Sequence, residues 1–363
     1  MRTATRLLTL CTVFALVACA SRPLERYSET VPATVLATIG DAGVVDLRAS
    51  YRSAVCARLP AEAGRCDEVL LRLPGEAPVA ASAAKPAVAA DLPQRYRIAF
   101  VPGFFAECLG RFAEPFADVR APLESEGFVV DFLGVPGRGS VAANARHLAG
   151  LLEAGAVDSR PYIVFAHSKG MTDVLELMAR YPQTAERIAA LVGVAGAVNG
   201  SPLADRLDSV YRRWAAAFPL PECNAGDGAE IRDLRRDVRL EWWRRHGADM
   251  KGPVFTLVAA PRPDRISPVS RAGYDWLAAV DPRNDGRLLW SDQIAPRSYL
   301  LGYANADHYA VAIPVSRTMP ALSFAFRDDV PRAALVRAAI DIVAATLRDG
   351  QAAAPGGPRA PGQ

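Results

Sequence analysis

From residue 95 onward, short apolar segments alternate with helical ones, and this alternation limits the possible folds more than any other feature. Six short segments are rich in β-branched and aromatic side chains, as buried strands require. They span residues 96–101, 128–133, 162–166, 188–195, 254–260 and 298–303. Segments with helical periodicity lie between them, including 141–154 and 171–180, and a last helix is expected at 329–347. The pattern predicts an α/β fold with a mostly parallel sheet flanked by helices.

The stretch between the fourth and fifth predicted strands is too long for a simple crossover. Residues 209–218 and 230–246 have helical patterns, and the loop between them is rich in Pro, Gly and polar residues. We therefore expect a helical cap at about 201–250, over the carboxyl edge of the sheet. The predicted α/β domain spans 95–348, and 349–363 is expected to be a disordered tail.

The first residues have the pattern of an export signal. Arg2 and Arg6 precede an apolar run of about a dozen residues, too short to cross the roughly 30 Å of hydrocarbon in a bilayer. The next residues, LVAC at 16–19, resemble the lipobox of bacterial lipoproteins, in which the chain is cut before a cysteine that is then acylated. The resemblance predicts a signal peptide at 1–18 and an exported lipoprotein of the cell envelope, anchored to the membrane through Cys19. Because Ala20 rather than Asp follows the cysteine, we expect the bacterial outer membrane.

Residues 19–94 are expected to hold a tether, a small helical segment and an Ala/Pro-rich linker. Helical spacing is present at 46–59, and a second short helix is expected at 66–73. Four cysteines remain after export and acylation, and an oxidising compartment favours two disulfides with three possible connectivities. The short separation of Cys56 and Cys66 favours that pair, which leaves Cys108 with Cys223.

The residues AHSKG at 166–170 lie between a predicted strand and a predicted helix. This is the setting of a G-x-S-x-G nucleophile elbow, in which a sharp turn lifts a serine above the sheet. Small residues on either side of the serine allow the strand and the helix to approach each other closely. Gly170 has this role here and Ala166 replaces the first glycine, so Ser168 is the candidate nucleophile.

Residues 95–348 therefore resemble the α/β-hydrolase fold, and in particular its bacterial lipase and esterase branch. The residues GSPLAD at 200–205 are similar to a G-S-P-x-A-D stretch of bacterial lipases. The resemblance does not cover residues 19–94. The cap after the fourth core strand and the small N-terminal helical segment are expected from the residue pattern, and we expect no cofactor.

A serine nucleophile needs a general base, and in this fold the chain order is serine, acid, histidine. His308 follows the last predicted strand, where the family has its base. The other histidines fit less well. His147 precedes the serine, His167 lies on the elbow itself pointing away, and His246 lies in the cap before any plausible acid.

The acid is expected at Asp264, which follows the fifth strand in PRPDRISP, a segment similar to the D-x-x-V-P turn of many relatives. Asp307 is the alternative, although an immediate neighbour of the base rarely reaches that base's imidazole. The remaining acids of this region are expected to be solvated turn residues or caps, namely Asp275, Asp281, Asp285 and Asp292.

Backbone N–H groups should stabilise the oxyanion of the tetrahedral intermediate. One should come from Lys169, directly after the nucleophile. The other should come from the loop after the first core strand, which reads PGFF at 102–105 where relatives often have His-Gly. By position, Phe104 supplies this second N–H.

Composition narrows the functional classes further. With 42 basic and 39 acidic residues, the chain has no general electrostatic attraction for nucleic acid. It contains no Cys/His cluster with metal-ligand spacing, so we expect no metal site.

The sequence predicts a serine hydrolase that cleaves carboxylic esters, with an ester or acyl compound as substrate. Acyl transfer, thioester hydrolysis, polyester depolymerisation and a catalytically inactive lipoprotein scaffold stay open, because the fold is compatible with each.

Overall fold

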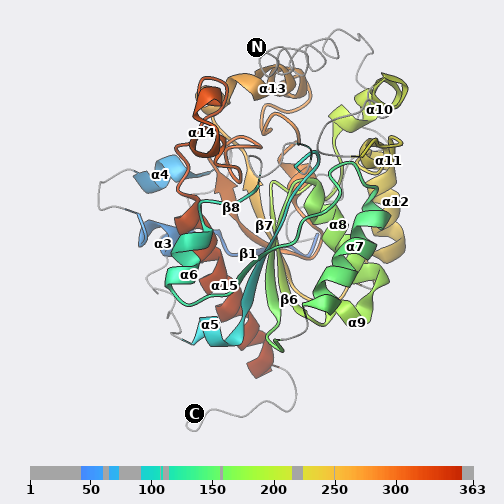
Figure 1. Cartoon of the computed structure of the whole chain (residues 1–363). Helices are drawn as coiled ribbons and strands as arrows, with labels where there is room; N and C mark the ends of the chain where they lie inside the picture. Colours follow the sequence, from blue (N-terminus) through green and yellow to red (C-terminus); the bar gives the residue numbers. More distant parts are fainter. Residues whose placement is uncertain are drawn as a thin grey trace.

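A central sheet organises the computed structural model, which describes residues 42–59, 65–72, 91–106, 108, 114–155, 158–214, 224–248 and 250–353. The sheet has eight strands in the order β1-β8-β7-β6-β5-β3-β4, with β2 also paired to β8 (Figure 1). All pairings are parallel except that of β2 with β8. The strands are β1 (Val45–Asp46), β2 (Leu70–Leu71), β3 (Arg97–Val101), β4 (Val130–Phe132), β5 (Tyr162–His167), β6 (Ile188–Val194), β7 (Val254–Ala259) and β8 (Tyr299–Ala304). The predicted α/β class and parallel sheet are confirmed.

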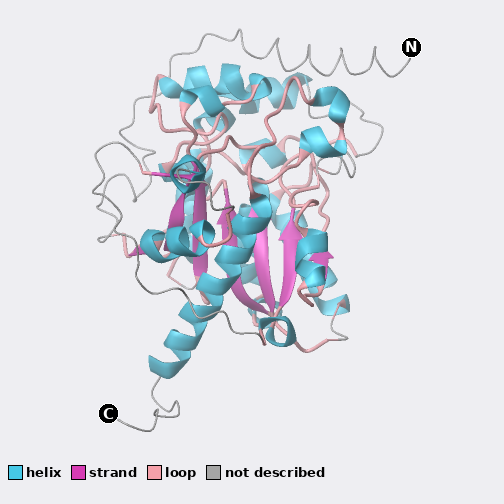
Figure 2. Cartoon of the chain, turned by 90° about the vertical axis from the view of Figure 1, so that its left-hand side faces the viewer, coloured by secondary structure: helices cyan, strands magenta, loops and turns pink. Residues whose placement is uncertain are grey.

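Helices cover both faces of this sheet, which is why its central strands are apolar on both sides. One face carries α7 (Val141–Ala154), α8 (Lys169–Arg180) and α12 (Arg236–His246). The other carries α3 (Arg48–Cys56), α6 (Arg120–Ser125) and α15 (Arg332–Ala353). Figure 2 looks onto this second face, with the magenta strands behind the helices. Every residue of β5 and β7 is buried, as expected for strands enclosed by two helical layers.

Helix α7 has the predicted bounds. Two other predictions were wrong in part: the helix expected at 209–218 already begins at Pro202, and the helix expected at 66–73 ends at Val69, where the chain continues as strand β2. Ser140 accepts a hydrogen bond from the Ala143 amide at 3.2 Å and caps the start of α7. At the other end of the chain, α15 continues to Ala353, so the first residues of the predicted tail are helical. Residues 354–363 lie outside the described residues.

The predicted cap lies between β6 and β7, after the fourth core strand. It comprises α10 (Pro202–Trp214), α11 (Ala229–Arg232) and α12. The single helix expected at 230–246 is divided, because the Leu234 carbonyl accepts a hydrogen bond from the Ser201 amide at 2.9 Å instead of continuing the helical ladder. Helix α12 packs beside α8, and the Trp242 indole donates to the Glu176 carboxylate. It therefore flanks the sheet, whereas α10 and α11 lie nearer the carboxyl edge (Figure 1).

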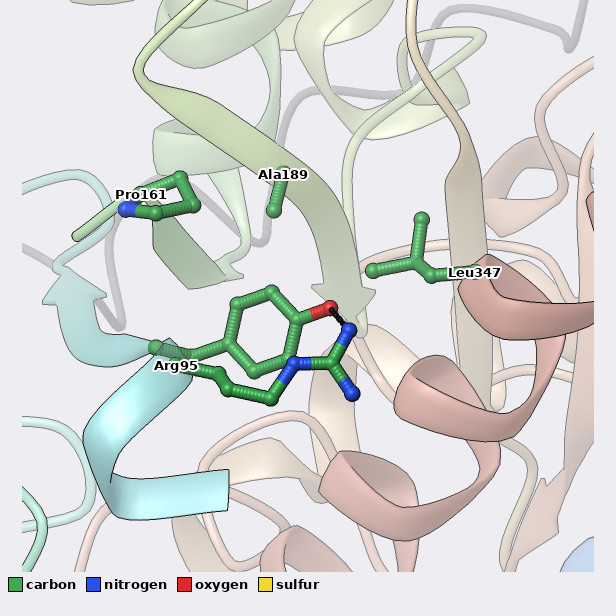
Figure 3. Close-up of a pocket in the computed structure, with 5 residues that line it drawn as sticks. Arg95, Pro161, Ala189 and Leu347 are labelled. Carbon is green, nitrogen blue, oxygen red and sulfur yellow. Dashed lines mark hydrogen bonds between the residues drawn. The ribbon is translucent and has the colours of Figure 1, made fainter. Parts of the chain in front are cut away.

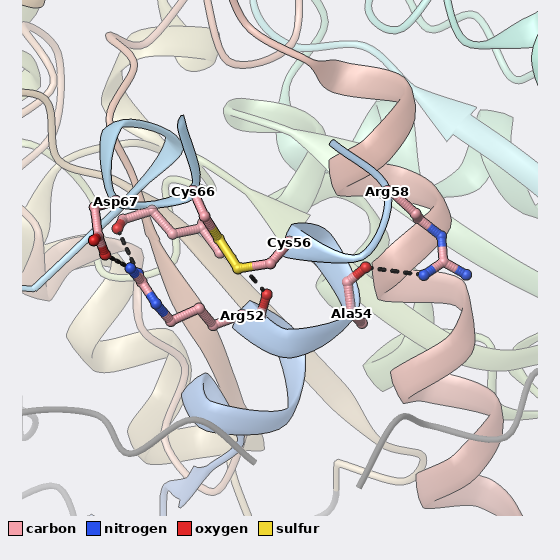
Figure 4. Close-up of a disulfide and its surroundings, with 7 residues drawn as sticks. Arg52, Ala54, Cys56, Arg58, Cys66 and Asp67 are labelled. Atoms are coloured by element: carbon pink, nitrogen blue, oxygen red, sulfur yellow. Dashed lines mark hydrogen bonds and ion pairs between the residues drawn. A yellow bond between two sulfur atoms is a disulfide. The ribbon is translucent and has the colours of Figure 1, made fainter. Parts of the chain in front are cut away.

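The N-terminal segment is built into the edge of the sheet, which the sequence did not predict. Strands β1 and β2 both pair with β8, and the Tyr51 hydroxyl in α3 donates to the Leu335 carbonyl in α15 at 3.0 Å. The disulfide between Cys56 and Cys66 joins α3 to α4 (Arg65–Val69), as expected (Figure 4). Cys108 is also disulfide-bonded, but its expected partner, Cys223, lies outside the described residues, as does Cys19.

Shorter elements complete the domain. They are α5 (Leu92–Arg95), α9 (Pro182–Ala185), α13 (Arg271–Ala278), α14 (Val315–Thr318), and the 3₁₀ turns η3 (Pro263–Arg265), η4 (Pro268–Ser270), η5 (Ser291–Gln293) and η6 (Pro320–Leu322). None of the helices within the described ranges combines the length and apolarity needed to cross a bilayer.

A small pocket opens beside α5, lined by Arg95, Tyr96, Pro161, Ala189 and Leu347. Its lining residues lie near the starts of β3, β5 and β6, and Figure 3 shows the Arg95 guanidinium reaching the Tyr96 hydroxyl, at 3.5 Å. The pocket is therefore at the amino end of the sheet, opposite the edge where parallel α/β folds bind ligands.

Candidate active site

Ser168 occupies the turn between β5 and α8 in a conformation that non-glycine residues rarely adopt. Its backbone angles are φ 55° and ψ −125°, which store strain at the nucleophile position of such elbows. Three backbone hydrogen bonds hold the residue in place. Its amide donates to the Val194 carbonyl at 3.3 Å, and its carbonyl accepts from the Met171 amide at 3.1 Å and the Ala197 amide at 3.0 Å.

Close backbone packing explains why small residues flank this serine. A Cβ atom on Gly170 would lie 2.4 Å from the Pro102 carbonyl oxygen. A Cβ atom on Gly103 would lie 2.7 Å from the Ser168 Cβ. The loop after β3 therefore passes directly against the elbow, and no larger side chain fits at either position.

His308 lies within hydrogen-bond distance of the nucleophile. Its Nε2 is 2.8 Å from the Ser168 Oγ, and its Nδ1 is 2.8 Å from an Asp285 carboxylate oxygen. The carboxylate can only accept, so Nδ1 carries the proton and Nε2 is the acceptor for the serine hydroxyl. This is the geometry of a serine, histidine and aspartate triad.

Asp285 is oriented by its own turn. One carboxylate oxygen accepts backbone hydrogen bonds from Arg287 at 2.8 Å and Leu288 at 2.7 Å, while the other faces the imidazole. The Asp285 carbonyl also accepts from the His308 amide at 3.0 Å. Both side chains are buried, so water does not compete for these contacts.

The prediction that Asp264 is the partner of His308 does not hold in this structure. Asp264 lies in the exposed turn η3, and the carboxylate against the imidazole belongs to Asp285, which we had expected to be a solvated turn residue or cap. The alternative, Asp307, is occupied elsewhere, because its carboxylate accepts from the amides of Ser267, Tyr309 and Ala310. The one local signal for Asp285 is the Gly286 that follows it, whose φ of +89° allows the turn to fold back.

The two expected oxyanion donors border the nucleophile. Phe104 follows Gly103 in the loop packed against Ser168, and Lys169 is the first residue of α8. Among the described residues, the Phe104 amide donates to no backbone carbonyl. The helix N-terminus at Lys169 adds a favourable dipole for developing negative charge.

The Lys169 side chain points away from this site. Its ammonium group is buried and pairs with the Asp173 carboxylate at 2.7 Å, and Asp173 also accepts from the Asn144 amide at 2.9 Å. Burial raises the pKa of Asp173. Lys169 therefore contributes to the first turn of α8 rather than to a substrate contact.

Comparison with known proteins identifies the family. No protein-family model matches the chain, and no curated protein matches it. Among solved structures, the metagenomic carboxyl esterase MGS0156 is 32% identical, with a TM-score of 0.77, covering 90% of this chain and 100% of that one. The chain belongs to this carboxyl esterase family of α/β-hydrolases. The propeptide form of the Bacillus licheniformis lipase BlEst2 is 20% identical with a TM-score of 0.51, covering 66% of this chain and 52% of that one; it shows the fold alone.

Within this carboxyl esterase fold, His167 has a role that the sequence analysis missed. Its ring Nε2 donates to the His308 carbonyl at 2.8 Å, and the two ring centroids are 5.0 Å apart. Burial and, to a lesser extent, the nearby His308 lower the pKa of His167 to about 3. His167 is therefore a neutral donor that holds the main chain of the triad histidine.

The cap contacts the loop after β3 through aromatic rings. The Tyr211 ring in α10 lies 6.0 Å from that of Phe104, and its hydroxyl donates to the Glu230 carboxylate at 2.8 Å.

No group of three or more His, Cys, Asp or Glu side chains in the described part of the chain is arranged to hold a metal ion.

Proposed function

We propose that this protein cleaves carboxylic esters through a covalent acyl-enzyme on Ser168. The observation that supports it most is the hydrogen-bonded series Ser168, His308 and Asp285, with contacts of 2.8 Å on either side of the imidazole. The proposal extends the established family relationship to a mechanism for this chain.

In the first half of the reaction, the Ser168 Oγ attacks the ester carbonyl carbon while His308 Nε2 takes the hydroxyl proton. Asp285 stabilises the imidazolium that forms. The backbone N–H groups of Phe104 and Lys169 donate to the oxyanion of the tetrahedral intermediate, each worth about 3 kcal/mol in comparable sites. Collapse breaks the bond to the alcohol, which leaves with the proton from His308.

In the second half, water replaces the alcohol. His308 takes a proton from the water, whose oxygen attacks the acyl carbon. The second tetrahedral intermediate then collapses, the imidazolium returns its proton to Ser168, and the carboxylic acid leaves. No cofactor takes part in any step.

We further propose that the enzyme is an exported lipoprotein, anchored in the bacterial outer membrane by acylation of Cys19. The support is the signal-like pattern of residues 1–18 and the LVAC residues at 16–19. Two or more acyl chains on one cysteine would be sufficient for stable membrane attachment.

Activity is tested with p-nitrophenyl esters of short to long acyl chain and a fluorophosphonate label. Wild type should hydrolyse part of the series and accept the label, whereas Ser168→Ala should do neither. Equal labelling of both forms would refute the acyl-enzyme proposal.

Anchoring is tested separately, by cell fractionation and mass spectrometry of Cys19→Ala. The variant should be unacylated and absent from the membrane fraction. An unchanged mass and an unchanged membrane fraction would contradict the anchoring proposal without affecting the catalytic one.

A further inference from the structure

A small apolar surface lies beside the catalytic edge, and we call it the rim patch: Val269 and Phe324 with the adjacent Arg317 and Arg327. The Phe324 side chain is 78% exposed, the most exposed large apolar side chain among the described residues, and Val269 is 41% exposed. The two loops lie side by side, because the Val269 amide donates to the Ala325 carbonyl at 3.2 Å. Exposed apolar side chains that cluster in this way usually mark an interaction site.

The rim patch is connected to the active site by two aromatic contacts. The Phe326 ring, two residues from Phe324, lies 5.8 Å from the Tyr309 ring, which lies 5.6 Å from the His308 ring. Figure 1 shows α13 and α14, which flank these loops, at the same end of the molecule as α10. Whatever binds the patch is therefore separated from His308 by two aromatic contacts.

The charges around the patch are mixed, with arginines slightly in excess. Five arginines and four aspartates of this region are at least partly exposed: Arg262, Arg265, Arg271, Arg317 and Arg327 with Asp118, Asp264, Asp328 and Asp329. Several of them pair with each other, but Arg317 remains 59% exposed and Arg327 is exposed as well. An exposed phenylalanine beside exposed arginines suits a surface with an apolar interior and an anionic outer layer.

We propose that the rim patch docks on an anionic phospholipid surface, with Phe324 entering the acyl region and the arginines contacting headgroup phosphates. The active site would then face the bilayer. Docking in this way would favour ester substrates that reside in or on the membrane over freely dissolved ones.

Docking through the rim patch would orient the enzyme that the proposed anchor attaches to the membrane. Between Cys19 and Ala42, the first described residue, lie 22 residues, which span at most about 75 Å when fully extended. A connection of that reach limits the distance to the membrane without selecting a face of the enzyme. The rim patch would make that selection, and its docking is measurable without the anchor.

The test uses the full chain carrying Cys19→Ala, so that acylation does not mask weak docking. Flotation with phosphatidylcholine vesicles, with and without phosphatidylglycerol, measures the partition coefficient. The parent should bind the anionic vesicles more tightly. Phe324→Ser should lower the partition coefficient about tenfold or more, and Arg327→Gln about fivefold on anionic vesicles only.

Val129→Ser is the matched control, because Val129 is 37% exposed but precedes β4 at the amino end of the sheet. It should bind as the parent does. All variants should hydrolyse a soluble short-chain ester at the parental rate, which shows that folding and catalysis are intact. On an ester embedded in anionic vesicles, Phe324→Ser should lose roughly tenfold in rate and Arg327→Gln roughly fivefold, whereas Val129→Ser should match the parent.

Vesicle binding that is unaffected by Phe324→Ser would overturn the proposal, and so would an absence of binding by the parent. A concentration-dependent dimer that Phe324→Ser abolishes would assign the patch to a second copy of the chain instead. Neither result depends on whether the soluble ester is cleaved, so failure of the catalytic proposal is recognised separately.

Discussion

The nucleophile elbow and the cap interface adjoin the same catalytic centre but are held by different kinds of contact. The elbow consists of Ser168 and the backbone around it, and the cap interface consists of the contacts between α10–α12 and the core. Backbone atoms in direct contact fix the first, and buried polar side chains fix the second. The difference determines which part tolerates substitution and which responds to pH.

At the elbow, the atoms are packed so closely that no additional side-chain atom fits at two positions. Gly103 and Gly170 each leave no space for a Cβ atom, and the serine is held by main-chain hydrogen bonds on both sides. Backbone contacts do not titrate. The backbone of Ser168 is therefore held by contacts that do not depend on pH.

The cap interface depends on charge. The Arg236 guanidinium in α12 pairs with the buried Asp292 carboxylate at 3.2 Å, and the Arg239 Nε donates to the Val198 carbonyl at 3.1 Å. Within the described residues, Asp292 Oδ2 and Arg239 Nη2 are buried without a hydrogen-bond partner. Burial raises the pKa of Asp292 to about 7 and lowers that of Arg239 to about 10. Such contacts are costly to bury and sensitive to protonation.

The largest effect is expected at the carboxylate of the triad. Asp285→Asn should lower kcat about a thousandfold or more, because the imidazole loses the anion that orients it and stabilises its charged form. Asp264→Asn is the matched control and should retain full activity, since its side chain is exposed. Steady-state kinetics on one soluble ester measure both variants. A larger loss of kcat in Asp264→Asn than in Asp285→Asn would identify Asp264 as the acid of the triad.

A methyl group at the elbow should be the next most damaging change. Gly170→Ala should reduce the free energy of unfolding by about 3 kcal/mol, because backbone carbonyls block the new Cβ atom. Gly150→Ala in α7, where an added Cβ atom would meet nothing within 4 Å beyond its own helix backbone and chain neighbours, should instead stabilise the protein slightly through helix propensity. Denaturant unfolding measures both, and equal effects would contradict the rigid-elbow interpretation.

His167 tests whether the elbow also positions the base. His167→Leu removes the donor to the His308 carbonyl and should lower kcat about tenfold with little change in KM, whereas His167→Gln should restore most of the activity.

The same residue predicts an acid-dependent loss of stability. The pKa of His167 is about 3 in the folded state against an ordinary 6.5, so the unfolded state binds the extra proton and stability falls as pH drops below 6.5. At pH 5 this costs about 2 kcal/mol relative to pH 8. Neither His167→Leu nor His167→Gln should show this acid-dependent loss of stability. If the loss persisted in His167→Gln, it would not come from His167.

The cap interface should show a change of similar size and opposite sign between about pH 4 and 7. Asp292 has a folded-state pKa of about 7 against an ordinary 3.8, so the folded state binds the extra proton and stability falls as pH rises from about 4 to 7. Between pH 5 and 7 the expected loss is about 2 kcal/mol. Asp292→Asn should reduce the dependence of the unfolding free energy on pH, measured by denaturant unfolding at several pH values. An unaltered dependence would mean that other groups cause it.

Features encoded in consecutive residues were predictable from the sequence. The strand segments, helix α7 and the elbow at 166–170 each depend on local periodicity or on a tight turn, which neighbouring residues specify directly. His308 was also accessible, because it directly follows the last core strand and the fold orders its functional residues along the chain.

The partner of that histidine depended on tertiary structure. Asp264 and Asp285 both follow β7, and the local sequence around Asp264 looked more like an acid turn. Only the folded loop shows that Gly286 turns Asp285 inward and buries it against the imidazole, while Asp264 stays in solvent.

The sequence by itself therefore determined the sheet, the serine and the base, because each is specified by residues close together in the chain. The tertiary structure alone decided the choice of acid, the hydrogen bond from His167 to the His308 carbonyl, and the pairing of β1 and β2 with β8. These contacts join segments far apart in the sequence, and their energies depend on burial and distance, which exist only once the chain has folded.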